Sequence, residues 1–250
     1  MKPAKSPLPK KPTPLSKHWE RTKRSLGRRW REWMLPRGYA RLGTRYGGWW
    51  VDTQAIGVPA LLIDAGLGED ISFPGAFLQR FAGSRVIGVE PNPRSLAYCR
   101  KHPLAGMEIL EQAFWTHAGD TLTFHLPRAQ EALPKGADGV SGSLVGSHEY
   151  VEGGETLTVH TVDLAAVLAY AGSKQCDVLK LDIEGAEYAV LKQLCDNGDI
   201  RLARQVLIEF HHRVTHHSLA ETEAIAALVA GCGFRLIHTE GRNYIFRRAD

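Results

Sequence analysis

Residues 61–70 read LLIDAGLGED, and this stretch decides the fold. It opens with a short apolar run without polar alternation, which is typical of a strand buried on both faces of a parallel sheet. Gly66 and Gly68 then predict a tight turn whose backbone a ligand can approach closely. Because open α/β sheets bind ligands beyond the carboxyl ends of their strands, we expect Asp64, these glycines and Asp70 to face a ligand. A carboxylate at position 64 suits a cationic ligand group better than a pyrophosphate, which it would repel.

A second carboxylate closes the next apolar run, residues 86–93, which read VIGVEPNP. Glu90 lies 22 residues after Gly68, where a carboxylate can accept hydrogen bonds from both hydroxyls of a ribose. Asn92 and the proline after it stop the strand and start a helix. We therefore expect Glu90 and Asn92 to belong to the same ligand site.

Residues 108–114, EILEQAF, predict a third strand and its exit. Polar groups at Gln112 and Ala113 could read the edge of an adenine there, and an aromatic side chain at Phe114 or Trp115 could stack on the base. Aromatic residues at strand ends are also common in the core, so the structural interpretation stays open.

Apolar runs alternate with helical patterns along the rest of the sequence. This alternation predicts an α/β domain with a doubly wound, mostly parallel sheet. One helical pattern covers residues 164–171, and another begins at a capping box, Ser218 to Glu221. Residues 121–126 and 157–162 alternate with period two and predict half-exposed antiparallel strands. The intervening insertion, about residues 127–156, is read as a lid over the site. The predicted core strands are Leu61–Ile63, Val86–Val89, Val178–Ile183, Val206–Phe210, Phe234–His238 and Asn243–Phe246.

Residues 177–187, DVLKLDIEGAE, place three charged residues on an otherwise apolar strand. Lys180, Asp182 and Glu184 stand at period two, which predicts that they share one face. Buried charges are costly unless paired, so the cluster indicates a catalytic site. The alternative is a lysine–carboxylate pair that braces the strand.

A fifth stretch, VLIEFHH at residues 206–212, ends in a carboxylate and an imidazole. His211 is expected to accept a proton near neutral pH. Asp182, Glu209 and His211 could also bind a divalent ion, although the sequence carries no established metal-ligand spacing and no metal site is predicted. His212, His216 and His217 are interpreted as solvated loop residues.

Charge is distributed unevenly along the 250 residues. The net charge is +4, yet residues 1–40 contain twelve Lys or Arg and only two Glu, which leaves the rest of the chain acidic. We expect a disordered Pro- and Lys-rich tail over residues 1–15, a basic amphipathic helical region over residues 16–50 and the catalytic domain over residues 51–250. The tryptophan face of that helix either packs on the domain or, through residues 16–35, docks on an anionic surface at the membrane periphery.

The cellular setting follows from what the sequence lacks. No apolar run is long enough to span a bilayer or to act as a secretory signal, and the four cysteines are widely spaced. These features predict a cytoplasmic protein with reduced thiols, either free or peripheral to the membrane.

Together these motifs resemble the FkbM-like branch of the class I S-adenosylmethionine-dependent methyltransferases. The resemblance covers about Ala60 to Phe246 and rests on DAGLGEDISF, VIGVEPNP, TVDL, VLKLDIEGAEYAVL and VLIEFH. It implies a seven-stranded Rossmann-like sheet whose last strand is antiparallel. It also implies that Asp64, Gly66 and Gly68 hold the methionine part of the cofactor, Glu90 the ribose and Gln112–Ala113 the adenine. Asp182 would lie near the reactive methyl group.

The resemblance implies methylation of a hydroxyl on a sugar or another small molecule. An alcohol must lose its proton as it attacks, and the candidate bases are Asp182, Glu184 and His211, with Lys180 holding one of them ionised. Most of the rate gain would come from placing the hydroxyl in line with the methyl group.

Three alternatives remain at this point. A methyltransferase acting on RNA or protein could be recruited by the basic N-terminus, but the chain has no Asn/Asp-Pro-Pro-Tyr or Pro-Cys element, and an acidic domain disfavours nucleic acid. A nicotinamide-dependent oxidoreductase would want a third glycine where Ile71 stands. A non-catalytic binding domain could dock on membranes through the N-terminal helix.

Overall fold

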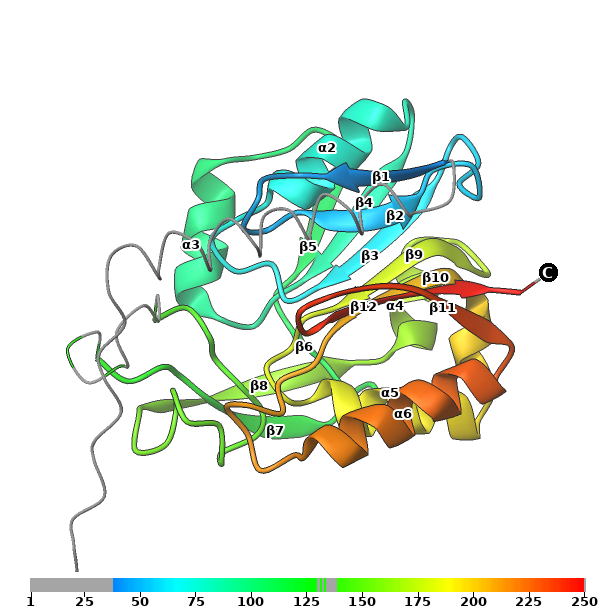
Figure 1. The fold of residues 1–250 in the computed structure, drawn as a ribbon. Helices are drawn as coiled ribbons and strands as arrows, with labels where there is room; N and C mark the ends of the chain where they lie inside the picture. The colour runs from blue at the N-terminus through cyan, green and yellow to red at the C-terminus, as the bar shows by residue number, and fades with distance from the viewer. Residues whose placement is uncertain (1–37, 130, 132, 134–138, 250) are drawn as a thin grey trace, which may run out of the picture. The chain divides into compact units, whose positions relative to one another are not determined.

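The central feature of the computed structural model is a seven-stranded sheet in the order β11-β12-β10-β9-β3-β4-β5 (Figure 1). The structure describes residues 38–129, 131, 133 and 139–249. Neighbouring strands from β5 to β10 are parallel, and β12 runs antiparallel to both β10 and β11. The mostly parallel α/β sheet and its antiparallel last strand are thus confirmed.

The predicted apolar runs form the sheet because their side chains are buried on both faces. The strands are β3 (Leu61–Ala65), β4 (Arg85–Val89), β5 (Met107–Leu110), β9 (Cys176–Leu181), β10 (Ala203–Glu209), β11 (Phe234–Glu240) and β12 (Asn243–Arg248). Every residue of β3 is buried. Its alternate side chains enter two different cores, since Leu61 and Ile63 belong to one and Leu62 to the other.

Helices cover both faces, as a doubly wound sheet requires. They are α2 (Ser72–Arg80), α3 (Pro93–Lys101), α4 (Leu164–Tyr170), α5 (Glu187–Asp196) and α6 (Leu219–Gly231), with a 3₁₀ turn η2 at Asp199–Leu202. Residues of α4, α5 and α6 share one core with the sheet, whereas Phe73 and Phe77 of α2 pack in the other. The capping box at Ser218 is present, which confirms the predicted start of α6.

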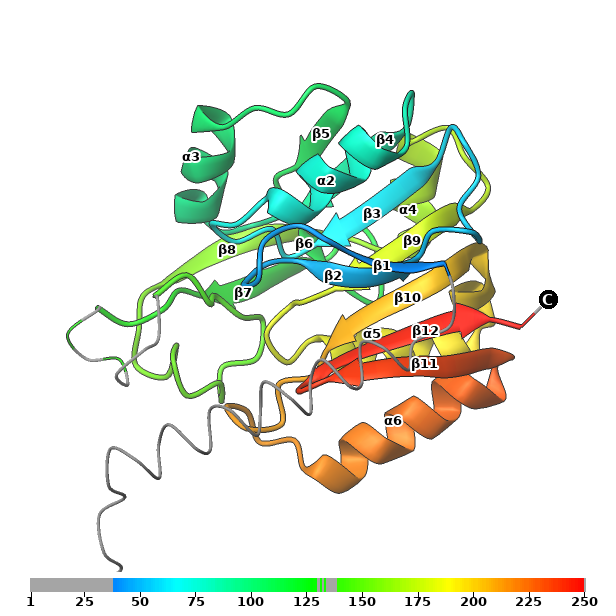
Figure 2. The same cartoon turned by 45° about the horizontal axis from the view of Figure 1, so that its top comes forward.

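Residues 38–50 correct the predicted domain boundary. They were expected to end a helical region, but β1 (Tyr39–Leu42) and β2 (Trp49–Asp52) pair as an antiparallel hairpin. The second core contains Leu42, Trp49 and Val51 of this hairpin, and Figure 2 shows the hairpin crossing one face of the sheet with α4 and α5 behind it. The compact unit begins at Gly38. The structure does not describe residues 1–37. The predicted tail at residues 1–15 and the predicted basic helix, including residues 16–35, therefore lie outside the described residues.

A second, three-stranded sheet carries the insertion. It consists of β6 (Ala113–Phe114), β7 (Thr121–His125) and β8 (Thr156–Val162), and β7 pairs antiparallel with β8 as the period-two pattern predicts. No helix in the described part of the chain is long and apolar enough to cross a bilayer.

Candidate functional site

A cavity of about 730 Å³ lies beyond the carboxyl ends of β3, β4, β9 and β10. Such strand ends are where open α/β sheets bind ligands. Nine of the sequence-predicted site residues line the cavity: Gly66, Gly68, Asp70, Glu90, Ala113, Lys180, Asp182, Glu184 and His211. Three others, Asp64, Asn92 and Gln112, are not among the lining residues.

Gly66 and Gly68, in the turn after β3, are required or tolerated for different structural reasons. Gly66 has a positive φ of 84°, and a Cβ there would stand 1.8 Å from the carbonyl oxygen of Asp182, so only glycine lets this turn pack against the end of β9. Gly68 has a φ of 58°, and a Cβ there would meet nothing within 4 Å. The first glycine therefore allows close packing, and the second leaves open space at the cavity wall.

Glu90 joins the ends of β3 and β4 through backbone hydrogen bonds. Its carboxylate accepts from the backbone N–H groups of Leu67 at 2.9 Å, Gly68 at 3.1 Å and Asn92 at 2.8 Å. Burial raises the pKa of this carboxyl although these bonds oppose the shift. Asn92 caps α3 by accepting from the Arg94 backbone N–H at 3.0 Å, which explains why it does not line the cavity.

Lys180 bridges two carboxylates below the cavity. Its Nζ lies 3.0 Å from Asp64 Oδ1 and 3.7 Å from Asp182 Oδ2. Burial opposes the charged form of Lys180, but these two carboxylates raise its pKa. Asp64 is 1% exposed and is paired with this ammonium, so its carboxylate acts on the site through Lys180. The predicted bracing pair is therefore present, and Asp182 at its other end faces the cavity.

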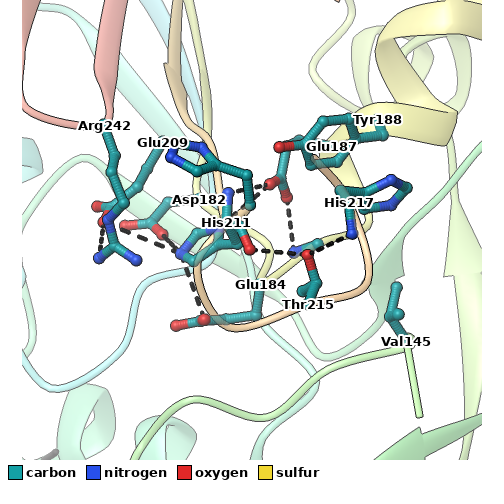
Figure 3. Close-up of polar contacts among 12 residues, drawn as sticks. Val145, Asp182, Glu184, Glu187, Tyr188, Glu209, His211, Thr215, His217 and Arg242 are labelled. Carbon is teal, nitrogen blue, oxygen red and sulfur yellow. Dashed lines mark hydrogen bonds and ion pairs between the residues drawn. The ribbon is translucent and has the colours of Figure 1, made fainter. Parts of the chain in front are cut away.

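His211 is at the centre of four carboxylates (Figure 3). Its Nε2 lies 3.2 Å from Glu184 Oε2, 3.6 Å from Asp182 Oδ1 and 3.9 Å from Glu209 Oε1. On the other side of the ring, Nδ1 lies 3.2 Å from Glu187 Oε1.

Burial disfavours the imidazolium, but Glu184 and Glu187 outweigh it and raise the pKa of His211 to about 10. The sequence expectation of a neutral imidazole that accepts a proton near pH 7 thus differs from the structure. His211 is cationic at that pH because four acids surround it.

The carboxylates around His211 differ in acidity. Burial alone would raise the pKa of Glu184, but His211 and His148 lower it to about 2, so this group stays ionised. Burial and the neighbouring Asp182 raise the pKa of Glu209 to about 7 despite its ion pair with Arg242. Burial also raises the pKa of Asp182. Glu209 is therefore suited to accept a proton near neutral pH, and the raised pKa of Asp182 makes it the second candidate base.

The family follows from comparison with known proteins. Residues 60–236 match the model of the methyltransferase FkbM domain. The chain belongs to the FkbM methyltransferase family. No curated protein matches the sequence.

Solved structures similar to this FkbM-family chain are distant. They include a fibrillarin/Nop5p complex, with a TM-score of 0.42, 7% identity and coverage of 77% of this chain and 73% of that chain. A SAM-dependent methyltransferase from Aquifex aeolicus has a TM-score of 0.34, 12% identity and coverage of 76% and 81%. The small RNA methyltransferase HEN1 has a TM-score of 0.31, 11% identity and coverage of 99% and 27%.

The predicted strand extends to Ile183, but β9 ends at Leu181, so Asp182 and Glu184 lie in the following turn and not on one strand face.

Two groups in the FkbM-family site were missed by sequence reasoning. Glu187 at the start of α5 is fully buried and accepts from the backbone N–H groups of Gly185 and His211. Its place in the IEGAE segment was a signal that could have found it.

His148 is the other missed group, and its local sequence gives no signal. It lies in the insertion and is 0% exposed, yet its Nε2 is 2.9 Å from Glu184 Oε2. Only the folded chain brings these residues, 36 positions apart, together.

Donor atoms of Asp182, Glu184 and His211 lie within 4.8 Å of one another. Two carboxylates and an imidazole are a donor set that suits a divalent ion. The sequence suggested Asp182, Glu209 and His211 as a possible donor set. The structure brings Asp182 and His211 together with Glu184 in place of Glu209.

Proposed function

We propose that this chain is an S-adenosylmethionine-dependent O-methyltransferase whose acceptor is a hydroxyl of a sugar or another small molecule. The observation that carries the proposal is the composition of the cavity in this FkbM-family fold. Its described lining includes seven acidic residues against four Lys or Arg and the cationic His211, an acidic excess that favours a ligand with positive charge. A sulfonium cofactor meets that requirement, whereas a pyrophosphate does not.

The residues present fit this cofactor at its two ends. Gly68 leaves open space beside the cavity, where a Cβ would meet no atom, and Glu90 stands at the adjoining strand end. Glu90 would hold the ribose, Ala113 would lie by the adenine, and the Gly66–Gly68 turn with Asp70 would hold the methionine part. Asn92 and Gln112 would act from outside the cavity wall, Asn92 by fixing the backbone beside Glu90.

When bound, S-adenosylmethionine would supply the methyl group of its sulfonium to the acceptor oxygen, and the electrons of the broken C–S bond would stay on sulfur. The acceptor's proton passes to Glu209 or Asp182, the two carboxylates whose pKa is raised. His211, as a cation, holds both carboxylates at the cavity and stabilises the negative charge that develops on the acceptor oxygen as its proton leaves. Lys180 fixes Asp182 from below.

A small acceptor is supported by the walls of the cavity. The β1–β2 hairpin contributes Arg45 and Tyr46, and the insertion contributes Leu144 and Tyr150. These segments enclose a volume typical of small-molecule sites. An RNA or protein acceptor would have to reach the same carboxylates past both segments.

Isothermal titration with S-adenosylhomocysteine tests the cofactor assignment. We expect binding to the wild type and a loss of affinity of about 10- to 100-fold in Glu90→Ala, since a hydrogen bond to a charged group contributes about 1.5–3 kcal/mol. Glu223→Ala, on the exposed face of α6, is the matched control and should bind like the wild type. Absence of both heat and thermal shift with this ligand in the wild type would overturn the proposal. A screen of hydroxylated acceptors, with and without Mg²⁺, then identifies the acceptor class and any use of the Asp182–Glu184–His211 donor set.

A further inference from the structure

The insertion forms a hydrogen bond to the backbone of Glu184, in the turn after β9. The Ser143 hydroxyl donates a hydrogen bond to the carbonyl oxygen of Glu184 at 2.6 Å, and it accepts one from the Val145 backbone N–H at 2.8 Å. Ser143 is fully buried, so this contact is shielded from water. The insertion therefore fixes one end of the Glu184 residue through its main chain.

His148 fixes the other end of the same residue. The Tyr150 backbone N–H donates to His148 Nδ1 at 3.2 Å, so this nitrogen carries no proton. Nε2 then carries the ring proton that is donated to Glu184 Oε2 at 2.9 Å. Glu184 Oε2 is thereby shared between His148 and His211, whose Nε2 is 3.2 Å away.

Glu184 needs such support because of its backbone conformation. Its φ is 54°, and it is the one residue other than glycine with a positive φ in the described part of the chain. Residues other than glycine rarely adopt this backbone conformation, and it persists where surrounding contacts impose it. Ser143 and His148 supply these contacts at the two ends of the residue.

We propose that His148 and Ser143 are positioning residues: the insertion holds Glu184 so that its carboxylate fixes His211 beside Asp182 and Glu209, the two carboxylates that accept the proton. This inference rests on the proposed function, since Glu184 and His211 belong to its acid–base cluster. The insertion then does more than cover the cavity, because it supplies the partner that aims a carboxylate of the site.

Kinetics of His148 variants test the proposal. We expect His148→Ala to lower kcat by about 10- to 100-fold, the effect of a small misplacement of reacting groups, with KM for the cofactor nearly unchanged. His148→Gln should recover most of the rate, because its amide N–H reaches the position of Nε2, whereas His148→Asn should not. Ser147→Ala is the matched control: its hydroxyl bonds to His216 Nδ1 at 2.7 Å, so the change loosens the insertion without touching Glu184.

Three outcomes would overturn the proposal. His148→Ala could turn over like the wild type, Gln and Asn could be equally active, or Ser147→Ala could lose as much rate as His148→Ala. If His148→Ala unfolds, the comparison of kcat between His148→Gln and His148→Asn tests the proposal instead.

A readout without an acceptor separates this inference from the proposed function. Nitrogen-15 NMR of the imidazoles should show His148 as the Nε2–H tautomer, with a signal that moves in Glu184→Gln. The Nδ1–H tautomer would overturn the inference even where S-adenosylhomocysteine binds. Failure of that ligand to bind, with the expected tautomer present, would overturn the proposed function alone.

Discussion

Glu209 and His211 divide the acid–base roles at the end of β10. Because the pKa of Glu209 is raised to about 7, the carboxylate is fully ionised only above that pH. We expect kcat to rise with pH, reach half its maximum near pH 7 and stay level until His211 loses its proton near 10. Glu209→Gln should remove the rise and lower kcat about 10²- to 10⁴-fold, the usual contribution of a general base. A pH–rate profile with saturating cofactor measures this, and superimposable profiles for the two proteins would contradict it.

Gly66 ties the β3 turn to the end of β9. Gly66→Ala combines a positive φ of 84° with a Cβ placed 1.8 Å from the Asp182 carbonyl oxygen. Strain and overpacking together predict a loss of roughly 2–5 kcal/mol in the free energy of unfolding. The melting temperature should fall by roughly 5–15 °C in a calorimetric scan. Gly198→Ala is the control, because its φ is 82° but a Cβ there meets nothing within 4 Å. Equal losses in the two variants would show that the collision is unimportant.

At the level of elements, the ends of β3, β4 and β10 and the β7–β8 pair were predictable from sequence, whereas the end of β9, the β1–β2 hairpin and the loop that carries His148 were not. β3, β4 and β10 read as apolar runs closed by a polar residue, since parallel strands buried on both faces leave no other pattern. The β1–β2 hairpin was missed because its strands, YARL and WWVD, are only four residues long and show no clear alternation of apolar and polar side chains. The contact of His148 with Glu184 joins residues 36 apart and depends on how the insertion folds back.

The β1–β2 hairpin is held over the cavity by Asp70. Its carboxylate accepts from Thr44 Oγ1 at 2.6 Å and from the Gly47 backbone N–H at 3.1 Å. Asp70→Ala removes both bonds, each worth about 1.5–3 kcal/mol to a charged acceptor. We expect faster amide hydrogen exchange across residues 43–48 and several-fold higher KM values for both the cofactor and the acceptor. Asp199→Ala, at the half-buried start of η2, should leave exchange in the hairpin unchanged. Unaltered hairpin exchange in Asp70→Ala would show that the strands alone fix the hairpin.

At the level of the whole molecule, the described part of the site and the basic N-terminus lie in different stretches of the sequence. The described residues that line the cavity all belong to the compact unit that begins at Gly38, and this unit includes the whole seven-stranded sheet. The positive charge of the chain is concentrated before that unit, in residues 1–37. The chemistry and the charge that would recruit an anionic partner therefore lie in different parts of the sequence.

Removal of residues 1–37 should consequently leave cofactor affinity and turnover of a small hydroxylated acceptor within about twofold of the full chain, because the described residues that line the cavity are all retained. Titration with S-adenosylhomocysteine and steady-state kinetics of both proteins measure this. Binding to vesicles with anionic lipid should decline in the shortened protein, since each Lys or Arg near such a surface contributes about 1 kcal/mol. A shortened protein that methylates small acceptors normally but loses activity on RNA or protein would favour a macromolecular acceptor recruited by the basic segment. Loss of all activity, with cofactor binding intact, would instead show that residues 1–37 complete the acceptor site.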